Sequence, residues 1–181
     1  MRAFGSEAKY YDLFHKDKDY AGQAREIRKR YPKAKTVLEI GSGTGLMTKE
    51  LEKLGFEITM LEPSIDMLIE LGKKFPKRFV YDIPIQDFPL GIRYDLVLAL
   101  YDVLNYVSFK DFRGVYEKIQ RLGKDHIIEV WPPDPVKWFT YKRVGNCHRI
   151  RLGFKLFDKV FLWYIFWGDG LVVSHHRLYI H

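Results

Sequence analysis

The chain has 181 residues, of which 47% are hydrophobic and 29% charged, a composition typical of one folded domain rather than a disordered segment. It contains no apolar run of the length that a transmembrane helix needs, and its first residues lack the apolar segment of a secretion signal. The single cysteine, Cys147, excludes an internal disulfide and a cysteine-rich metal site, and these features together predict a cytoplasmic protein.

Positive charge is concentrated toward the two ends of the chain. The net charge is +7; residues 1–35 hold 10 Lys and Arg against 5 Asp and Glu, and residues 132–181 hold 8 against 3. The middle segment, 36–131, holds 12 against 15. A positive surface favours anionic partners such as phosphates or nucleic acid, but a solvated lysine-rich surface explains the same charge equally well.

Strands and helices alternate through the first two thirds of the sequence. In chain order the patterns predict a helix from Asp19 to about Arg30, a strand at 36–40, a helix at about 45–54, a strand at 56–61, a helix at about 65–73, strands at 78–82 and 94–100, a helix at about 111–122 and a strand at 126–131. Such alternation indicates right-handed βαβ units and therefore a parallel sheet.

The pattern changes after Trp131. A proline-rich stretch at 132–135 cannot belong to a helix or a central strand. Beyond it, residues 148–157, 160–167 and 171–180 are typical of antiparallel strands, and the glycines at 168–170 favour a hairpin turn. We therefore expect one domain over residues 1–181, with an N-terminal lid (1–35), a core (36–131) and an appended antiparallel sheet (132–181) on the substrate side.

The strongest motif is Glu39-Ile40-Gly41-Ser42-Gly43-Thr44-Gly45 between a strand and a helix. Glycines there let backbone N–H groups and the helix N-terminus approach a polar ligand closely. A dinucleotide fingerprint has the spacing G-x-G-x-x-G, whereas this motif is G-x-G-x-G with an acidic residue before it. The motif resembles that of the class I methyltransferases that use S-adenosyl-L-methionine (SAM).

The second predicted strand ends at Glu62, 21 residues after Gly41. A carboxylate at that position can accept hydrogen bonds from both ribose hydroxyls of a nucleoside. The resemblance further implies that the cofactor contacts the motif residues and a set spread over the later strand ends, namely Glu39, Gly41, Ser42, Gly43, Gly45, Pro63, Ser64, Met67, Asp82, Ile85, Gln86, Leu100 and Tyr101. At the adenine end the family's usual Asp is replaced by Pro84, so Asp82, Gln86 or packing against Ile85 would take its place.

From Tyr10 to Trp131 the chain is similar to small-molecule N-methyltransferases, above all the aminosugar N,N-dimethyltransferases and more distantly glycine N-methyltransferase-like enzymes. The matching pieces are Tyr11-Asp12-Leu13-Phe14, Lys18-Asp19-Tyr20, the glycine motif, 61–68, 86–88, 102–106 and 129–132. The resemblance implies an α/β Rossmann-like sheet of order 3-2-1-4-5. It also places Tyr11 and Tyr20 in a lid over the cofactor, His15 and Tyr106 at the catalytic centre, and Trp131 with Tyr106 in the substrate pocket.

The chain departs from these relatives at its end, where the family's last β-hairpin is missing. An uncovered sheet edge invites strand pairing, so we expect a homodimer. We expect no metal site, because the adjacent histidines His175 and His176 would face opposite sides of a strand.

The sequence therefore predicts a SAM-dependent methyltransferase that acts on a small molecule, with an amine nitrogen as the favoured acceptor. The basic surface is compatible with an acceptor that also carries an anionic group. His15 would take a proton from the amine, since imidazole titrates near ~6.5. Two alternatives stay open. The basic ends favour an RNA methyltransferase, and the missing hairpin favours a SAM-binding protein without catalysis.

Overall fold

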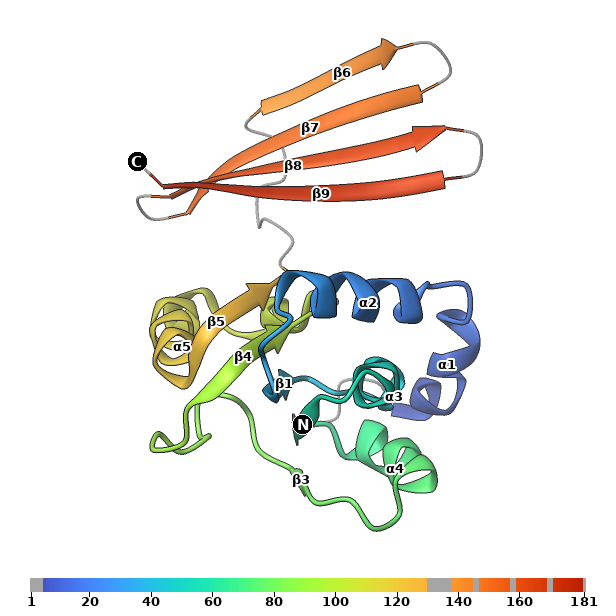
Figure 1. Cartoon of the computed structure of the whole chain (residues 1–181), viewed down its shortest axis with the longest axis vertical. Helices are drawn as coiled ribbons and strands as arrows, with labels where there is room; N and C mark the ends of the chain where they lie inside the picture. Colours follow the sequence, from blue (N-terminus) through green and yellow to red (C-terminus); the bar gives the residue numbers. More distant parts are fainter. Residues whose placement is uncertain (1–4, 130–137, 145–146, 157–158, 169–170, 181) are drawn as a thin grey trace. The chain divides into compact units, whose positions relative to one another are not determined.

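The computed structural model describes residues 5–129, 138–144, 147–156, 159–168 and 171–180 (Figure 1). Contacts divide the chain into two compact units, 1–130 and 131–181, and each is described by itself. The predicted single domain stays a prediction. Within the described ranges, no helix is long and apolar enough to cross a membrane.

The first unit alternates strands and helices as the sequence predicts. Its elements are the 3-10 helix η1 (Gly5–Tyr10), α1 (Tyr11–Phe14), α2 (Tyr20–Arg30), β1 (Thr36–Ile40), α3 (Leu46–Lys53), β2 (Glu57–Leu61), α4 (Ile65–Lys74), β3 (Val80–Tyr81), β4 (Tyr94–Ala99), the 3-10 helix η2 (Val103–Tyr106), α5 (Phe109–Leu122) and β5 (Gly123–Ile128). β5 begins three residues earlier than predicted, because Gly123 leaves α5 in an extended conformation and pairs directly with Tyr94.

The five strands form one parallel sheet in the order β3-β2-β1-β4-β5, which confirms the predicted order. β1 lies at the centre, where Ile40 is in register with Leu61 of β2 and Val37 with Leu96 of β4. After β1 the chain adds β2 and β3 on one side of this strand and then adds β4 and β5 on the other side. In such sheets the connections diverge at this reversal and leave a crevice at the carboxyl ends of the central strands.

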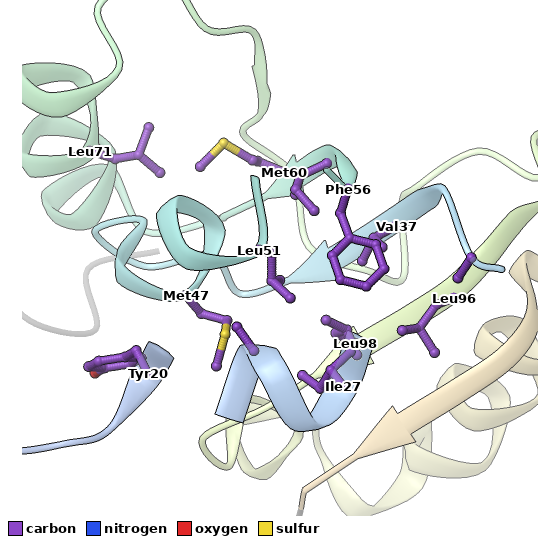
Figure 2. Packing of buried hydrophobic residues seen from close by; sticks show 13 residues of the cluster. Tyr20, Ile27, Val37, Met47, Leu51, Phe56, Met60, Leu71, Leu96 and Leu98 are labelled. Atoms are coloured by element: carbon purple, nitrogen blue, oxygen red, sulfur yellow. The ribbon is translucent and has the colours of Figure 1, made fainter. Parts of the chain in front are cut away.

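Both faces of the sheet are covered by helices, which is why its central strands are apolar on both sides. On one face Val37 and Leu96 pack with Ile27 of α2 and Leu51 of α3, as Figure 2 shows. On the other face Leu38 packs in a cluster that includes the buried residues of α5. Leu38, Leu51 and Leu96 are fully buried, and each such side chain stabilises the fold by roughly 1.5–3 kcal/mol.

The second unit is a four-stranded antiparallel sheet in the order β6-β7-β8-β9. Its strands are β6 (Trp138–Val144), β7 (Cys147–Leu156), β8 (Lys159–Gly168) and β9 (Leu171–Ile180). β7, β8 and β9 match the three strands predicted from the sequence, and β6 is a strand that the sequence analysis missed. Their predicted place on the substrate side stays a prediction.

Candidate functional site

A cavity of about 530 Å³ lies in the first unit at the carboxyl ends of the central strands. Its walls come from the loops after β1, β2, β3 and β4, from the end of β5 and from the segment around α1. Most residues predicted for the cofactor line it: Tyr11, Tyr20, Glu39, Gly41, Ser42, Gly43, Glu62, Pro63, Ser64, Met67, Ile85, Gln86, Leu100 and Tyr101. His15 and Tyr106, predicted for catalysis, line it as well.

Residues 41–45, which we call the glycine loop, adopt backbone angles that require glycine. Gly41, Gly43 and Gly45 have φ values of 71°, 56° and 82°, in the left-handed region that side chains disfavour. A Cβ on Gly41 would lie 2.0 Å from Val103 Cγ2, whereas a Cβ on Gly43 would meet no atom within 4 Å. Packing therefore adds a second reason for glycine at position 41, and at position 43 the loop leaves open space beside the cavity.

Glu62 follows β2 and is 5% exposed. Its Oε2 accepts a hydrogen bond from the Gly43 N–H, and its Oε1 accepts one from the Ser64 N–H, each at 2.8 Å. Burial raises the pKa of the Glu62 carboxyl, and the two backbone N–H groups oppose that rise. A carboxylate has about four acceptor positions, so this one can accept further hydrogen bonds from a ligand in the cavity.

Glu39 lies near the end of β1 and is also buried. The Thr48 hydroxyl of α3 donates a hydrogen bond to Glu39 Oε2. Burial raises the pKa of the Glu39 carboxyl to about 7, although the Thr48 hydrogen bond acts in the opposite direction. The cavity wall therefore contains a carboxyl group whose charge changes near neutral pH.

The segment around α1 contributes an aromatic wall. The rings of Tyr11 and His15 are stacked, with centroids 4.1 Å apart. His15 Nδ1 lies 2.9 Å from the Tyr11 carbonyl oxygen, which can only accept, so Nδ1 is the donor of this hydrogen bond. The Tyr20 hydroxyl is buried and has no hydrogen-bond partner within the described part of the chain.

The loop after β4 is strained at the point where it meets the cavity. Tyr101 and Asp102 have φ values of 56° and 60°, which are uncommon for residues other than glycine. The Tyr101 N–H donates to Glu129 Oε2 at 2.8 Å, and its hydroxyl donates to Gln23 of α2. Lys18 Nζ lies 4.3 Å from the centre of the Tyr101 ring. These contacts hold the strained loop in place between α2 and the end of β5.

The surroundings of this loop shift the pKa values of Lys18 and Tyr101. Burial lowers the pKa of Lys18, and the carboxylates of Glu129 and Asp102 partly restore it. Burial also raises the pKa of the Tyr101 hydroxyl. Lys18, Asp102 and Glu129 occur in the matching motifs, but no role was predicted for them. Glu129 falls inside the strand predicted at 126–131, whereas the observed β5 ends one residue before it, at Ile128.

Two of the residues predicted to bind the cofactor do not line the cavity. Gly45 is not among the residues that line the cavity; it is the N-cap of α3, and a Cβ there would lie 2.6 Å from Phe75 Cε2. Asp82 follows β3, is exposed and does not line the cavity, whereas the neighbouring Ile85 is buried in its wall. Trp131 lies outside the described residues. The roles of these three residues stay predictions.

Within the described part of the chain, no group of three or more His, Cys, Asp or Glu side chains is arranged to hold a metal ion. The cavity walls instead contain carboxylates, hydroxyls, aromatic rings and backbone N–H groups. Such a lining fits an organic ligand with several polar groups.

Part of the chain is similar to known methyltransferases. Residues 37–126 match the family model described as a methyltransferase domain. The dTDP-3-amino-3,4,6-trideoxy-alpha-D-glucopyranose N,N-dimethyltransferase of Streptomyces venezuelae is 32% identical over 113 residues, which cover 59% of this chain and 48% of the relative. The dTDP-3-amino-3,6-dideoxy-alpha-D-glucopyranose N,N-dimethyltransferase of Streptomyces fradiae is 30% identical over 110 residues, covering 58% of this chain and 43% of the relative. The chain thus spans about half the length of the curated relatives it matches.

Solved structures show the same fold. Streptomyces venezuelae DesVI superposes with a TM-score of 0.64 at 22% identity, covering 96% of this chain and 82% of that one. The CcbJ methyltransferase from Streptomyces caelestis superposes with a TM-score of 0.62 at 18% identity, covering 98% and 80%. These likenesses confirm the Rossmann-like class I methyltransferase fold.

Proposed function

We propose that the chain, whose residues 37–126 match the methyltransferase-domain model, is a SAM-dependent methyltransferase acting on an amine nitrogen of a small molecule. The observation that carries the proposal is the position of Glu62. Its buried carboxylate joins the glycine loop to the end of β2 and keeps acceptor positions for a ligand in the cavity. An acidic side chain at this strand end suits the hydroxyls of a nucleoside ribose, which supports the proposal.

The cavity residues fit the parts of SAM. Glu62 would accept from the ribose hydroxyls, and Ile85 with Gln86 would enclose the adenine. The buried oxygens of Tyr20 and Ser64, which have no hydrogen-bond partner within the described ranges, would bind polar groups of the ligand. Because a buried polar atom without a partner costs roughly 1–3 kcal/mol, two such atoms in one wall support a polar occupant.

The charge of the cavity favours a cationic ligand and an amine acceptor. The described lining includes the carboxyl groups of Glu39, Glu62, Asp102 and Glu129 against the ammonium of Lys18. A wall with this excess of carboxylates stabilises positive charge and disfavours an anionic group close to it. An anionic part of the acceptor would therefore lie away from this wall.

SAM, when bound, would supply a methyl group activated by its sulfonium for transfer to the acceptor nitrogen. The contribution of the chain is to hold the acceptor nitrogen in line and to keep water away. Tyr11 and Tyr106 would close the cavity, and Nε2 of His15 would accept a proton from the amine. The printed names of the relatives make amino sugars the first acceptors to test. A chain with a single cysteine fits a reducing compartment, so the cytoplasm stays our prediction.

The test is isothermal titration with SAM and with S-adenosylhomocysteine, using NAD as the control ligand. We expect micromolar binding of the first two and none of NAD. Glu62→Ala should weaken binding at least about tenfold, since each hydrogen bond to a charged group contributes roughly 1.5–3 kcal/mol. The control variant Glu57→Ala changes an exposed residue of β2, the strand that precedes Glu62, and should bind as the wild type does.

Other results would assign a different function. A wild type that binds neither methyl-cycle ligand contradicts the proposal. Binding with no turnover on amino sugars or other amines indicates a SAM-binding protein without catalysis. Turnover on RNA alone, at a rate that depends steeply on salt, indicates the RNA methyltransferase alternative.

A further inference from the structure

Asp12 of α1 joins the N-terminal segment to two other parts of the first unit. Its carboxylate forms an ion pair with Lys74 Nζ at the end of α4 and accepts a hydrogen bond from the Thr44 hydroxyl in the glycine loop. Lys74 Nζ also donates to the Thr44 carbonyl oxygen at 3.0 Å. These three residues form a closed set of contacts that we call the Asp12 clamp.

The clamp lies in a partly shielded position. Thr44 is 2% exposed, and the side chains of Asp12 and Lys74 are 40% and 32% exposed. An ion pair that also makes hydrogen bonds in such a position is stronger than a fully exposed pair, but it remains sensitive to salt. Lys74 also lies in the last turn of α4, where a positive charge interacts favourably with the helix dipole.

The position of α1 depends on contacts of this kind. The helix has only four residues, no buried side chain and no side-chain cap, so it cannot be stable by itself. The preceding helix η1 is attached to α4 by the Gly5 N–H, which donates to Asp66 Oδ2 at 3.0 Å. The Asp12 clamp connects α1 to the glycine loop.

Tyr11 is adjacent to Asp12 and lines the cavity, whereas Asp12 and Lys74 are not among the lining residues. Successive residues of a helix point about 100° apart, so one turn can direct Tyr11 into the cavity and Asp12 to the clamp. The pKa of the Tyr11 hydroxyl is raised by burial and then by the charges of Tyr106, Glu62 and Asp12. Asp12 also contributes to the raised pKa of Tyr20.

We propose that Asp12 is a positioning residue whose pairing with Lys74 and Thr44 holds Tyr11 over the cavity and slows release of the bound cofactor. The inference rests on the proposed function, because it takes the cavity to be the SAM site. Asp12 touches neither the cofactor nor the acceptor in this scheme. It determines how long the N-terminal segment stays closed over them.

The experiment compares Asp12→Asn, Lys74→Met and the double variant with the wild type. Asp12→Asn keeps the size of the side chain and an oxygen for the Thr44 hydroxyl, but it removes the charge that pairs with Lys74. Lys73→Met is the matched control, because Lys73 belongs to the same turn of α4 and pairs only with the neighbouring Glu70 among the described contacts. Dissociation rates and Kd values for SAM and S-adenosylhomocysteine are measured at low and high salt, and the unfolding midpoint of each variant is recorded.

We expect each single variant to increase the dissociation rate about two- to fivefold, as the loss of a partly exposed ion pair predicts. The double variant should be no faster than the singles, because either change already breaks the pair. Salt should accelerate release from the wild type and from Lys73→Met more than from the clamp variants. A merely structural role would lower the unfolding midpoint and leave the dissociation rates unchanged.

Three results would overturn the inference. Clamp variants with wild-type release rates would show that the pair does not hold the segment closed. Additive effects in the double variant would show that Asp12 and Lys74 act separately. If the wild type binds neither ligand, the proposed function is overturned and the role of Asp12 with it. If the wild type binds SAM but the clamp variants release it at the wild-type rate, only the role of the clamp is overturned. If Asp12→Asn does not fold, Lys74→Met provides the same comparison.

Discussion

Two carboxyl groups in one cavity wall have different surroundings and therefore different properties. Glu62 is held by two backbone N–H groups, while Glu39 has the single hydroxyl of Thr48. Burial raises the pKa of the Glu39 carboxyl to about 7, because only one side-chain hydrogen bond acts against it. Glu39 therefore changes charge near neutral pH, which the sequence motif does not reveal.

This raised pKa predicts a pH-dependent stability of the ligand-free protein. A carboxyl whose folded pKa exceeds its unfolded value of 4.5 stabilises the fold below about pH 4.5, and that contribution is lost as the pH rises to about 7. Relative to Glu39→Gln, the wild type should lose up to roughly 3 kcal/mol of unfolding free energy over this range. Urea unfolding of both proteins between pH 4.5 and 8 measures the difference.

The control for this prediction is Glu57→Gln, which changes an exposed residue of β2. The unfolding free energy of this variant should follow that of the wild type at every pH. A constant difference between the wild type and Glu39→Gln across the range would contradict the prediction, because it would mean that position 39 does not titrate there.

His15 is the second residue whose surroundings suggest a role. Its Nδ1 proton is bound by the Tyr11 carbonyl, and stacking on Tyr11 fixes the plane of the ring. The other nitrogen, Nε2, is the one left to accept a proton from the amine. His15→Ala should lower kcat for an amine acceptor by about a hundredfold or more, because a general base contributes roughly 10²–10⁴-fold. An unchanged kcat and pH profile would remove His15 from the mechanism.

At the scale of elements, α2 shows how a local sequence determines a helix start. Asp19 is the N-cap, and its carboxylate accepts a hydrogen bond from the Gly22 N–H at 2.7 Å. A Cβ on Gly22 would lie 2.0 Å from Asp19 Oδ2. Glycine at position 22 therefore leaves room for the capping carboxylate at the start of a helix whose first residue, Tyr20, lines the cavity.

Replacing glycine by alanine should consequently have different effects in two helices. Gly114→Ala in α5, where the added Cβ meets no atom within 4 Å, should raise the unfolding free energy by about 0.5–1 kcal/mol. Gly22→Ala should displace the Asp19 cap, which costs about 1 kcal/mol and cancels that gain. Thermal or urea unfolding of the two variants measures the contrast.

A background variant makes this comparison sharper. In Asp19→Ala no cap remains to be displaced, so adding Gly22→Ala should recover the usual stabilisation by alanine. Equal stabilisation by Gly22→Ala and Gly114→Ala in the wild-type background would mean that the Asp19 hydrogen bond contributes nothing to α2.

At the scale of the whole molecule, parallel strand order brings the site together. The glycine loop, Glu62 and Tyr101 follow β1, β2 and β4, which are neighbours in the sheet. Because parallel strands all end at one edge, residues far apart in the sequence converge there. The strand order of the first unit was therefore predictable from the βαβ pattern, whereas most of the residues that line the cavity were named through the resemblance to methyltransferases.

The sequence by itself determined the features that local patterns encode. Alternating strands and helices predict the sheet, and the glycine spacing with Glu62 predicts the cavity, because each depends on residues close to one another in the chain. Only the tertiary structure revealed the contacts between distant side chains: Asp12 with Thr44 and Lys74, and Tyr101 with Glu129, which is 28 residues away. No periodicity predicts such contacts, since they depend on how the short N-terminal segment and the loops pack against the finished sheet.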